Sequence, residues 1–394
     1  MEKPKCTEKS IVECLRKNSV VVYPETMEEY MEKMNLVIEH QLEFPSKIQH
    51  IILTTENGER EPQQFLQIIY DAVRAFFFGE PHQQTSTPST GWHGPDMTLD
   101  TEEQIEVAIR FFPEILNEEY TDNIFPHRMN QIPPSKRGCH PIYLLMTCSN
   151  AIVFVPLLAE LGDEIGKFSK KQRGGLGCSF RGVFFQLVNG TIRQGEFGGE
   201  EPQRKLDRVS TAVMVRLKDK GLMKTEDVYK YNLVNLLLYQ GIHNPASVIE
   251  QRLRFLIDCD RYILKDCVRG VTLLDHFVYR LSSNIRSQFP NGQTPPHIVH
   301  IFRLIVEASI FYYPMEFGFV FHGRNFKYAC KNIGTKATKI AIDDEISNII
   351  CNQRSSLRAM VFSAAMNNDI SLDGLYTLFR HDPMALLSKH SVVR

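Results

Sequence analysis

The sequence predicts a mainly α protein, and three observations carry that prediction. Most readable segments place apolar side chains at the three- and four-residue spacing of one helix face. The alternation that is typical of strands is nearly absent. A glycine turn followed by an apolar helix also recurs, which predicts a solenoid-like array of helical hairpins with insertions.

Length, composition and charge limit the kinds of function that fit. With 394 residues, 43% of them hydrophobic, the chain can form two or three domains or one extended array. Lys and Arg number 45 against 46 Asp and Glu, so the net charge is −1. Such a chain has no overall field that would attract nucleic acid or an anionic membrane. We therefore expect a protein partner that is recognised locally, and the sequence disfavours nucleic acid.

The nine cysteines are scattered and never spaced as Cys-x-x-Cys. This pattern argues against a disulfide framework and against a zinc finger, so no metal and no cofactor is expected. The N-terminus has no apolar core of a signal peptide, and no run approaches ~18 apolar residues. The sequence thus predicts a cytoplasmic or nuclear protein that does not enter a membrane.

Two helices are predicted around prolines. Residues 244–258 have Asn244 at the N-cap position and Pro245 at the first helical position. Residues 294–311 have Pro296 near their start and one polar stripe along an otherwise apolar helix. The stripe consists of His300, Arg303 and Glu307.

The helical period predicts further helices, including a mostly buried one within residues 61–80 whose polar stripe is Gln67, Asp71 and Arg74. Residues 102–111 follow the capping-box pattern Thr101-x-x-Gln104. Only residues 182–188, "GVFFQLV", predict a strand or a buried hairpin. The remaining predicted helices are 25–42, 150–160, 203–219, 226–239, 336–350, 356–367 and 371–380.

Two stretches interrupt these helices and divide the chain. Residues 81–97 are rich in Ser, Thr, Pro and Gly and predict an exposed loop, and residues 162–199 hold ten of the 23 glycines. We place a division near residue 200. Predicted parts are 1–100 with N-terminal helices and a polar loop, 101–200 with repeats followed by a Gly-rich insertion, and 201–394 with a C-terminal repeat array.

The recurring glycine turn is clearest at two places. Gly270 is followed by Thr272, Leu273 and Leu274, close to the pattern Gly-x-Thr-Pro-Leu-His-x-Ala. The segment "GCHPIYLLMTCSNAIVFVPLLAELG" begins at Gly138 and adds an apolar second helix. Weaker copies occur at "GRNFKYACKNIG", where Gly334 takes the place of the turn glycine between helices, and at "RAMVFSAAMNNDISLDGLYTLFRHDP".

Residues 135–176, with "GCHPIYLL" and "FVPLLAELG", and residues 245–387, with "RFLIDCD" and "YACKNIG", resemble a family of divergent ankyrin-repeat-like proteins from unicellular eukaryotes. The resemblance implies stacked ankyrin-type helical hairpins and protein binding on the concave side, without catalytic residues. The Thr-Pro-Leu-His tetrad of standard ankyrin units is missing, so the units are degenerate.

The stretch "CDRYILKDCVRGVTLLDH" brings several side chains of metal-ligand type into residues 259–276. A zinc site needs about four such ligands converging on one ion. The repeat pattern instead distributes them over a helix end, an exposed finger and the next helix, so we expect a structural junction. The side chains in question are Cys259, Asp260, Asp266, Cys267, Asp275 and His276.

We expect a non-enzymatic scaffold or adaptor that contacts a protein partner through turn tips and first helices. The alternative role of each such residue is to cap a turn or pack locally. Two other functions stay open: an enzyme on an irregular α-helical fold, and a nucleic-acid binder using the basic segment 203–224, although a solvated helix face explains that segment better. Predicted contact residues are His140, Tyr143, Thr272, Asp275, His276, Asn325 and Tyr328.

Overall fold

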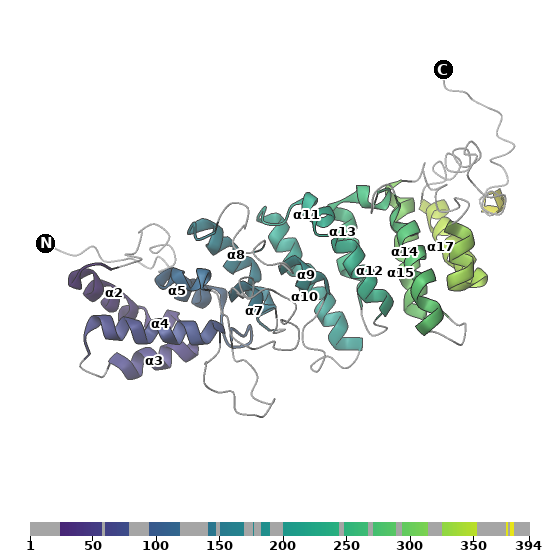
Figure 1. Ribbon diagram of the computed structural model, residues 1–394. Coiled ribbons are helices and arrows are strands. Elements are labelled where there is room, and N and C mark those ends of the chain that lie inside the picture. The colour runs from purple at the N-terminus through teal and green to yellow at the C-terminus, as the bar shows by residue number, and fades with distance from the viewer. Residues whose placement is uncertain are drawn as a thin grey trace, which may run out of the picture. The chain divides into compact units, whose positions relative to one another are not determined.

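A computed structural model shows a mainly helical protein (Figure 1). No β-strand occurs among the residues that the structure describes. The chain forms two compact units: residues 1–198 with 212–223, and residues 199–211 with 224–394. The structure describes residues 24–56, 60–78, 94–118, 141–146, 150–168, 176, 183–189, 200–243, 248–266, 271–288, 294–313, 325–352, 376 and 379–381.

The first unit begins with helices that pack around α4. Thr26 caps α2 through a capping box with Glu29, and α2 and α3 both contact α4. The predicted burial of α4 is confirmed, because most of its apolar residues are buried while Gln67 and Asp71 are exposed and Arg74 is half-buried. The elements are α2 (Met27–Glu39), the 3-10 helix η1 (Gln41–Glu43), α3 (Ser46–Glu56) and α4 (Pro62–Phe78).

Shorter helices complete the first unit. The predicted capping box at Thr101 and Gln104 is confirmed, and the helix that it starts, α5, contacts α8. The elements are α5 (Glu102–Phe111), η2 (Pro113–Asn117), α7 (Pro141–Leu145), η4 (Ile152–Phe154), α8 (Val155–Glu164) and α9 (Val183–Asn189).

The strand predicted at residues 182–188 is wrong, because α9 covers this segment. The run of aromatic and β-branched residues resembles a strand, but its buried residues follow the helical period instead. They are Val183, Phe184, Leu187 and Val188.

Helix α10 (Glu200–Asp219) contributes to both units, and its last turns belong to the first. There Arg216 pairs with Glu102 at the start of α5, and Lys220 pairs with Glu160 of α8. These contacts between opposite charges join residues more than fifty positions apart in the chain.

The second unit contains a helix break that the sequence pattern did not predict. Residues 226–239 were expected to form one helix, but α11 (Thr225–Lys230) ends before α12 (Leu233–His243) begins. Asn232 between them has φ of 54°. Asparagine tolerates this left-handed conformation better than most residues, which explains the break at this position.

The helix predicted at residues 244–258 begins later than expected. Helix α13 (Glu250–Cys259) follows Ile249, so Asn244 is not its N-cap, and Pro245 lies outside the described residues. The short helix η5 (Arg261–Leu264) then leads toward α14 (Leu273–Gln288), and α15 (Pro296–Tyr312) starts at the predicted proline.

The last described helices run from residue 325 to residue 352. They are α16 (Asn325–Ala329), the π-helical turn η7 (Cys330–Gly334) and α17 (Thr335–Asn352). Gly334, the last residue of η7, has φ of 100°, which only glycine adopts easily, and α17 begins directly after it. The helix predicted at 356–367 and most of that at 371–380 lie outside the described residues, as do Gly138, Gly270 and Gly323.

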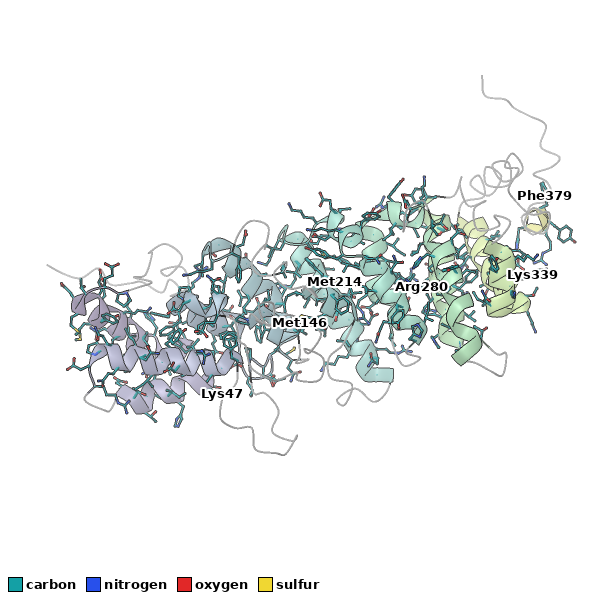
Figure 2. The ribbon with its side chains drawn as sticks, viewed as in Figure 1. Lys47, Met146, Met214, Arg280, Lys339 and Phe379 are labelled. Atoms are coloured by element: carbon teal, nitrogen blue, oxygen red, sulfur yellow. The ribbon has the colours of Figure 1, made fainter. Side chains whose placement is uncertain are left out.

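Helices of the second unit pack in an alternating order. Helix α14 contacts α12 on one flank and α16 on the other, while α15 contacts α13 and α17. Contacts of α12 with α13 and of α14 with α15 link the two rows, and side chains occupy the spaces between the ribbons (Figure 2). Gly241 allows a close approach here, since a Cβ atom would lie 2.6 Å from Cδ1 of Ile249.

Among the described helices, none is long and apolar enough to cross a membrane.

Candidate functional site

The predicted contact residues are only partly described. His140 lies outside the described residues. Tyr143 belongs to α7 and Asn325 to α16, but their side chains are not described. Tyr328 of α16 is 44% exposed, as a contact residue should be.

Thr272 and Asp275 cap a helix, which is the local role that the sequence analysis gave as the alternative to partner contact. The Thr272 hydroxyl accepts a hydrogen bond from the Asp275 amide at 3.1 Å and donates one to the Asp275 carboxylate at 2.7 Å. Together they cap the first turn of α14. The two residues therefore position the start of this helix, and they present little hydrogen-bonding capacity to a partner.

His276 follows on the same helix and is partly buried. Its pKa is lowered because burial disfavours the charged imidazolium, and the Arg280 guanidinium adds to the shift. The Nε atom of Arg280 donates to Nε2 of His276 at 3.3 Å. The contact holds Arg280, which is exposed, beside Tyr279.

Sequence reasoning named Tyr328 of α16 but missed two further exposed tyrosines, one on α12 and one on α14. Tyr239 of α12 is 51% exposed and Tyr279 of α14 is 70% exposed, and Tyr328 of α16 completes the series. Exposed cations neighbour two of them: Arg280 on α14, with Lys327 and Lys331 on α16 and η7. We call this set of exposed residues the tyrosine face: Tyr239, Tyr279, Arg280, Lys327, Tyr328 and Lys331.

The residues of the tyrosine face belong to the row of helices α12, α14 and α16, with the turn η7. Helix α14 contacts α12, α15 and α16, and its residues Tyr279 and Arg280 are exposed. Tyr239 and Tyr279 directly follow the buried residues Leu238 and Val278, whereas Tyr328 follows the exposed Lys327 and precedes the buried Ala329. The sequence could have indicated these tyrosines, because each is an aromatic residue at a helix position that the helical period predicts to be exposed.

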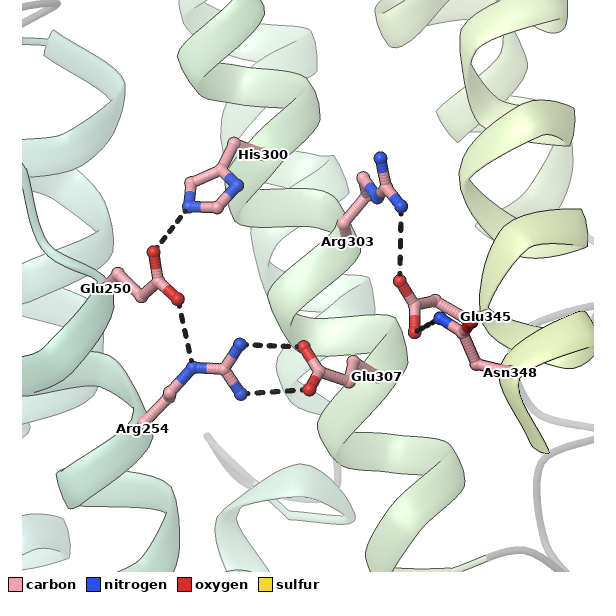
Figure 3. A network of polar contacts seen from close by, with 7 residues as sticks. All are labelled: Glu250, Arg254, His300, Arg303, Glu307, Glu345 and Asn348. Carbon is pink, nitrogen blue, oxygen red and sulfur yellow. Dashed lines mark hydrogen bonds and ion pairs between the residues drawn. The ribbon is translucent and has the colours of Figure 1, made fainter. Parts of the chain in front are cut away.

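The second row of helices, α13, α15 and α17, carries a network of charged side chains (Figure 3). Arg254 of α13 donates two hydrogen bonds to Glu307 of α15, at 3.0 and 2.9 Å. Glu250 accepts from Arg254 at 3.2 Å, and it lies 3.0 Å from Nε2 of His300. The predicted polar stripe of α15 is thus engaged with the neighbouring helix.

Arg303 extends the network from α15 to α17. It lies 3.2 Å from Asp344 and 3.5 Å from Glu345, and Asn348 donates to Glu345 at 3.4 Å. Burial opposes ionisation of Glu250, but the hydrogen bonds and charges of His300 and Arg254 prevail, so the pKa of Glu250 is lowered. Each carboxylate of the network contacts a basic side chain, and the contacts link neighbouring helices.

A buried ion pair holds the start of α13, and the sequence pattern did not reveal it. Asp207 of α10 and Arg252 of α13 are each 1% exposed, and the Arg252 Nε donates to the Asp207 carboxylate at 2.7 Å. That carboxylate also accepts from the backbone amides of Gln251, at 2.8 Å, and Arg252, at 3.3 Å. Asp207 therefore caps α13 from another helix, and its assignment to a solvated face of segment 203–224 is wrong.

A second group of titratable residues lies in the first unit around Phe112. Burial lowers the pKa of Lys33, and it raises the pKa of both Glu114 and Glu118. The Lys33 amine is 4.9 Å from the centre of the Phe112 ring. Because Lys33 is only 4% exposed, a substrate could reach its amine only after the helices had moved apart.

The junction at residues 259–276 has no described metal cluster. Asp260 caps η5 by accepting from the Tyr262 amide at 3.2 Å, and burial raises its pKa. Cys259 ends α13, while Cys267 lies outside the described residues. Where the structure describes the chain, no group of three or more His, Cys, Asp or Glu side chains could hold a metal ion.

Comparisons with protein-family models, with curated proteins and with solved structures find no match to this chain.

Proposed function

We propose that this chain is a non-enzymatic scaffold or adaptor that binds another protein along the tyrosine face of its second unit. The observation that carries the proposal is the alternating packing of helices: α14 lies between α12 and α16, and α15 lies between α13 and α17. Stacked helical hairpins expose one side of their first helices as an extended surface that can vary without disturbing the core.

The degenerate ankyrin-like pattern at residues 135–176 and 245–387 supports the same function. That pattern led us to expect hairpins stacked in a solenoid-like array, with first helices available for partner contact. The packing order of the second unit is compatible with such an array. Thr272 and Asp275 then serve the array by capping a first helix, and Tyr279 joins the predicted Tyr328 as a contact residue.

The composition of the tyrosine face also supports protein binding. Tyrosine and arginine are enriched among the residues that dominate protein interfaces, because their large side chains combine apolar contact with a polar end. Exposed tyrosines on α12, α14 and α16 offer three such anchors, at 51, 70 and 44% exposure. Smaller polar residues at these positions would keep the helices equally soluble, but they would not offer a partner the apolar contact area of a tyrosine ring.

Affinity purification of the full chain from its native cells, followed by mass spectrometry, tests the proposal. We expect reproducible partners with the natural chain and at least tenfold less of them with the triple variant Tyr239→Ser, Tyr279→Ser, Tyr328→Ser. The matched control is Tyr229→Ser, Tyr262→Ser, which removes exposed tyrosines outside the face. Circular dichroism should show equal helix content for all three proteins.

The absence of any reproducible partner, or equal losses in both variants, would contradict the proposal. Discovery of a small-molecule product formed by the chain, with loss of that activity on Lys33→Met, would favour an enzyme instead.

A further inference from the structure

We infer that residues 379–381 form a strap that closes onto α17 through Asp343, and that this carboxylate is available to another basic segment only while the strap is open. The strap is a conformational device within the second unit, and it does not depend on the tyrosine face. The inference follows from the contacts and the burial of Asp343.

Asp343 holds two consecutive residues near the end of the sequence. Its Oδ2 atom accepts a hydrogen bond from Nη2 of Arg380, and its Oδ1 atom lies 2.9 Å from Nε2 of His381. Each oxygen of the carboxylate has a partner of its own, so one side chain of α17 holds both residues. The two contacts span 37 and 38 positions of the chain.

The acidic residue that follows Asp343 contacts a different part of the chain. Asp344 lies 3.2 Å from Arg303 of α15 and belongs to the charged network. The side chain of Asp344 is 46% exposed, whereas that of Asp343 is 23% exposed. The His381 side chain is only 13% exposed, so its imidazole lies against the protein and not in solvent.

Asp343 belongs to a stripe of α17 that is otherwise exposed. Helical spacings of four, three and four residues place Lys336, Ile340, Asp343 and Ser347 on one side of this helix. The other three members of the stripe are exposed, and only Asp343 is half-buried. The strap therefore covers the stripe at the position where its basic side chains meet the carboxylate.

The contacts that close the strap are of a kind that opens readily. Ion pairs near the surface contribute little to stability, because water and salt screen them. The His381 pair carries opposite charges only when the imidazole is protonated. An open strap leaves the Asp343 carboxylate without these partners, and the guanidinium of another segment could then bind it.

Tryptic cleavage of the full-length chain after Arg380, followed by mass spectrometry, tests whether the strap opens. We expect Asp343→Asn to accelerate this cleavage at least fivefold relative to the natural chain. The matched control is Asp344→Asn, which makes the same charge change at the next position and should alter the rate less than twofold. Equal acceleration by both variants, or by neither, would overturn the inference.

His381→Gln opens the strap from its own side and leaves α17 unchanged. We expect it to accelerate cleavage after Arg380 as well, once each rate is divided by that of a free peptide with the same sequence. Hydrogen exchange in α15 should stay as in the natural chain for every variant. Faster exchange there would show that the unit unfolds, which would overturn a strap that opens by itself.

A fluorescent peptide with the sequence of residues 374–388 tests whether the uncovered carboxylate accepts another segment. We expect it to bind the variant Arg380→Ser, His381→Ser at least fivefold more tightly than the natural chain, in which the strap occupies Asp343. Adding Asp343→Asn to this variant should remove the gain. Equal affinity of the natural chain and the Arg380→Ser, His381→Ser variant, or a gain that persists with Asp343→Asn, would overturn the inference.

Discussion

Asp207 illustrates, at the scale of single residues, how a side chain can stabilise a helix from a distant position in the sequence. Its carboxylate accepts from the Gln251 amide 44 positions later and pairs with Arg252 in the core. The first amides of a helix lack partners within the helix, and Ile249 at the N-cap position offers no side-chain acceptor. One buried carboxylate therefore supplies both the cap and the counter-charge.

We expect Asp207→Asn to destabilise the second unit by about 3 kcal/mol, because the Arg252 charge stays buried without its partner. Urea unfolding monitored by circular dichroism measures the change. Asp219→Asn, at an exposed position on the same helix, is the control and should change stability by less than ~0.5 kcal/mol. An equal effect of the two substitutions would show that the buried pair has no special role.

Gly241 lies at a position of α12 where a side-chain methyl group would not fit. Alanine is the better helix former by roughly 1 kcal/mol, but the added Cβ would approach Cδ1 of Ile249 at 2.6 Å and Cδ1 of Ile301 at 2.9 Å. We expect Gly241→Ala to be destabilising by about 1 kcal/mol in thermal unfolding. Ile249→Val removes the nearer Cδ1 atom, so the double variant should recover part of the stability that Gly241→Ala loses. If the stability losses of the two single variants simply add in the double variant, the contact is not the cause.

At the scale of elements, the charged network links three helices of the second unit through exposed side chains. Arg254 and Glu307 join α13 to α15, and Arg303 joins α15 to α17. Exposed ion pairs contribute little individually, usually less than ~1 kcal/mol. Their effect on the relative placement of neighbouring helices is therefore modest and depends on pH and on salt.

Glu250 gives this network a defined pH dependence. Its pKa is lowered in the folded chain, so its contribution to stability is present above the ordinary value of 4.5 and is lost as pH falls through the folded pKa. We expect thermal unfolding of the natural chain to shift to lower temperature below about pH 4.5, and Glu250→Gln to reduce that shift.

Glu226→Gln is the control for this experiment, because Glu226 is exposed on α11 and has no part in the network. If both variants flatten the acid dependence equally, the effect arises from general carboxylate titration and not from the network.

At the scale of the whole molecule, helices of the second unit differ in how much of their surface is covered. Helix α15 contacts α12, α13, α14, α17 and η5, whereas α11 contacts α12 and α13. Local opening requires less disruption where fewer neighbours must separate. Protection of backbone amides should therefore rise from α11 to α15.

Hydrogen exchange followed by mass spectrometry measures this difference. We expect amides of α15 to exchange more slowly than those of α11 in the native chain. Addition of a protein partner that binds the tyrosine face should slow exchange in α14 and α16 more than in α13. Faster exchange in α15 than in α11 would contradict the packing order described above.

The sequence predicted the positions of the helices better than the contacts between them. The helices at residues 102–111 and 294–311, and the polar stripe His300, Arg303 and Glu307, were predicted from local period and capping alone. These features depend on neighbours within a few positions, so the sequence expresses them directly. The helix at 182–188 was mistaken for a strand because its short apolar run fits both periods, and packing decided between them.

The candidate site shows the same limit. Thr272, Asp275 and Tyr328 were singled out by their places in a repeat, but only the folded chain separates the capping pair from the exposed tyrosine. By itself, the sequence determined that this protein is mainly helical and where most helices lie. Tertiary structure alone decided that Asp207 meets Arg252 and that charged side chains of α13, α15 and α17 contact one another. Those interactions join residues tens of positions apart, and the local periodicity of a helix contains no information about which helix its faces will meet.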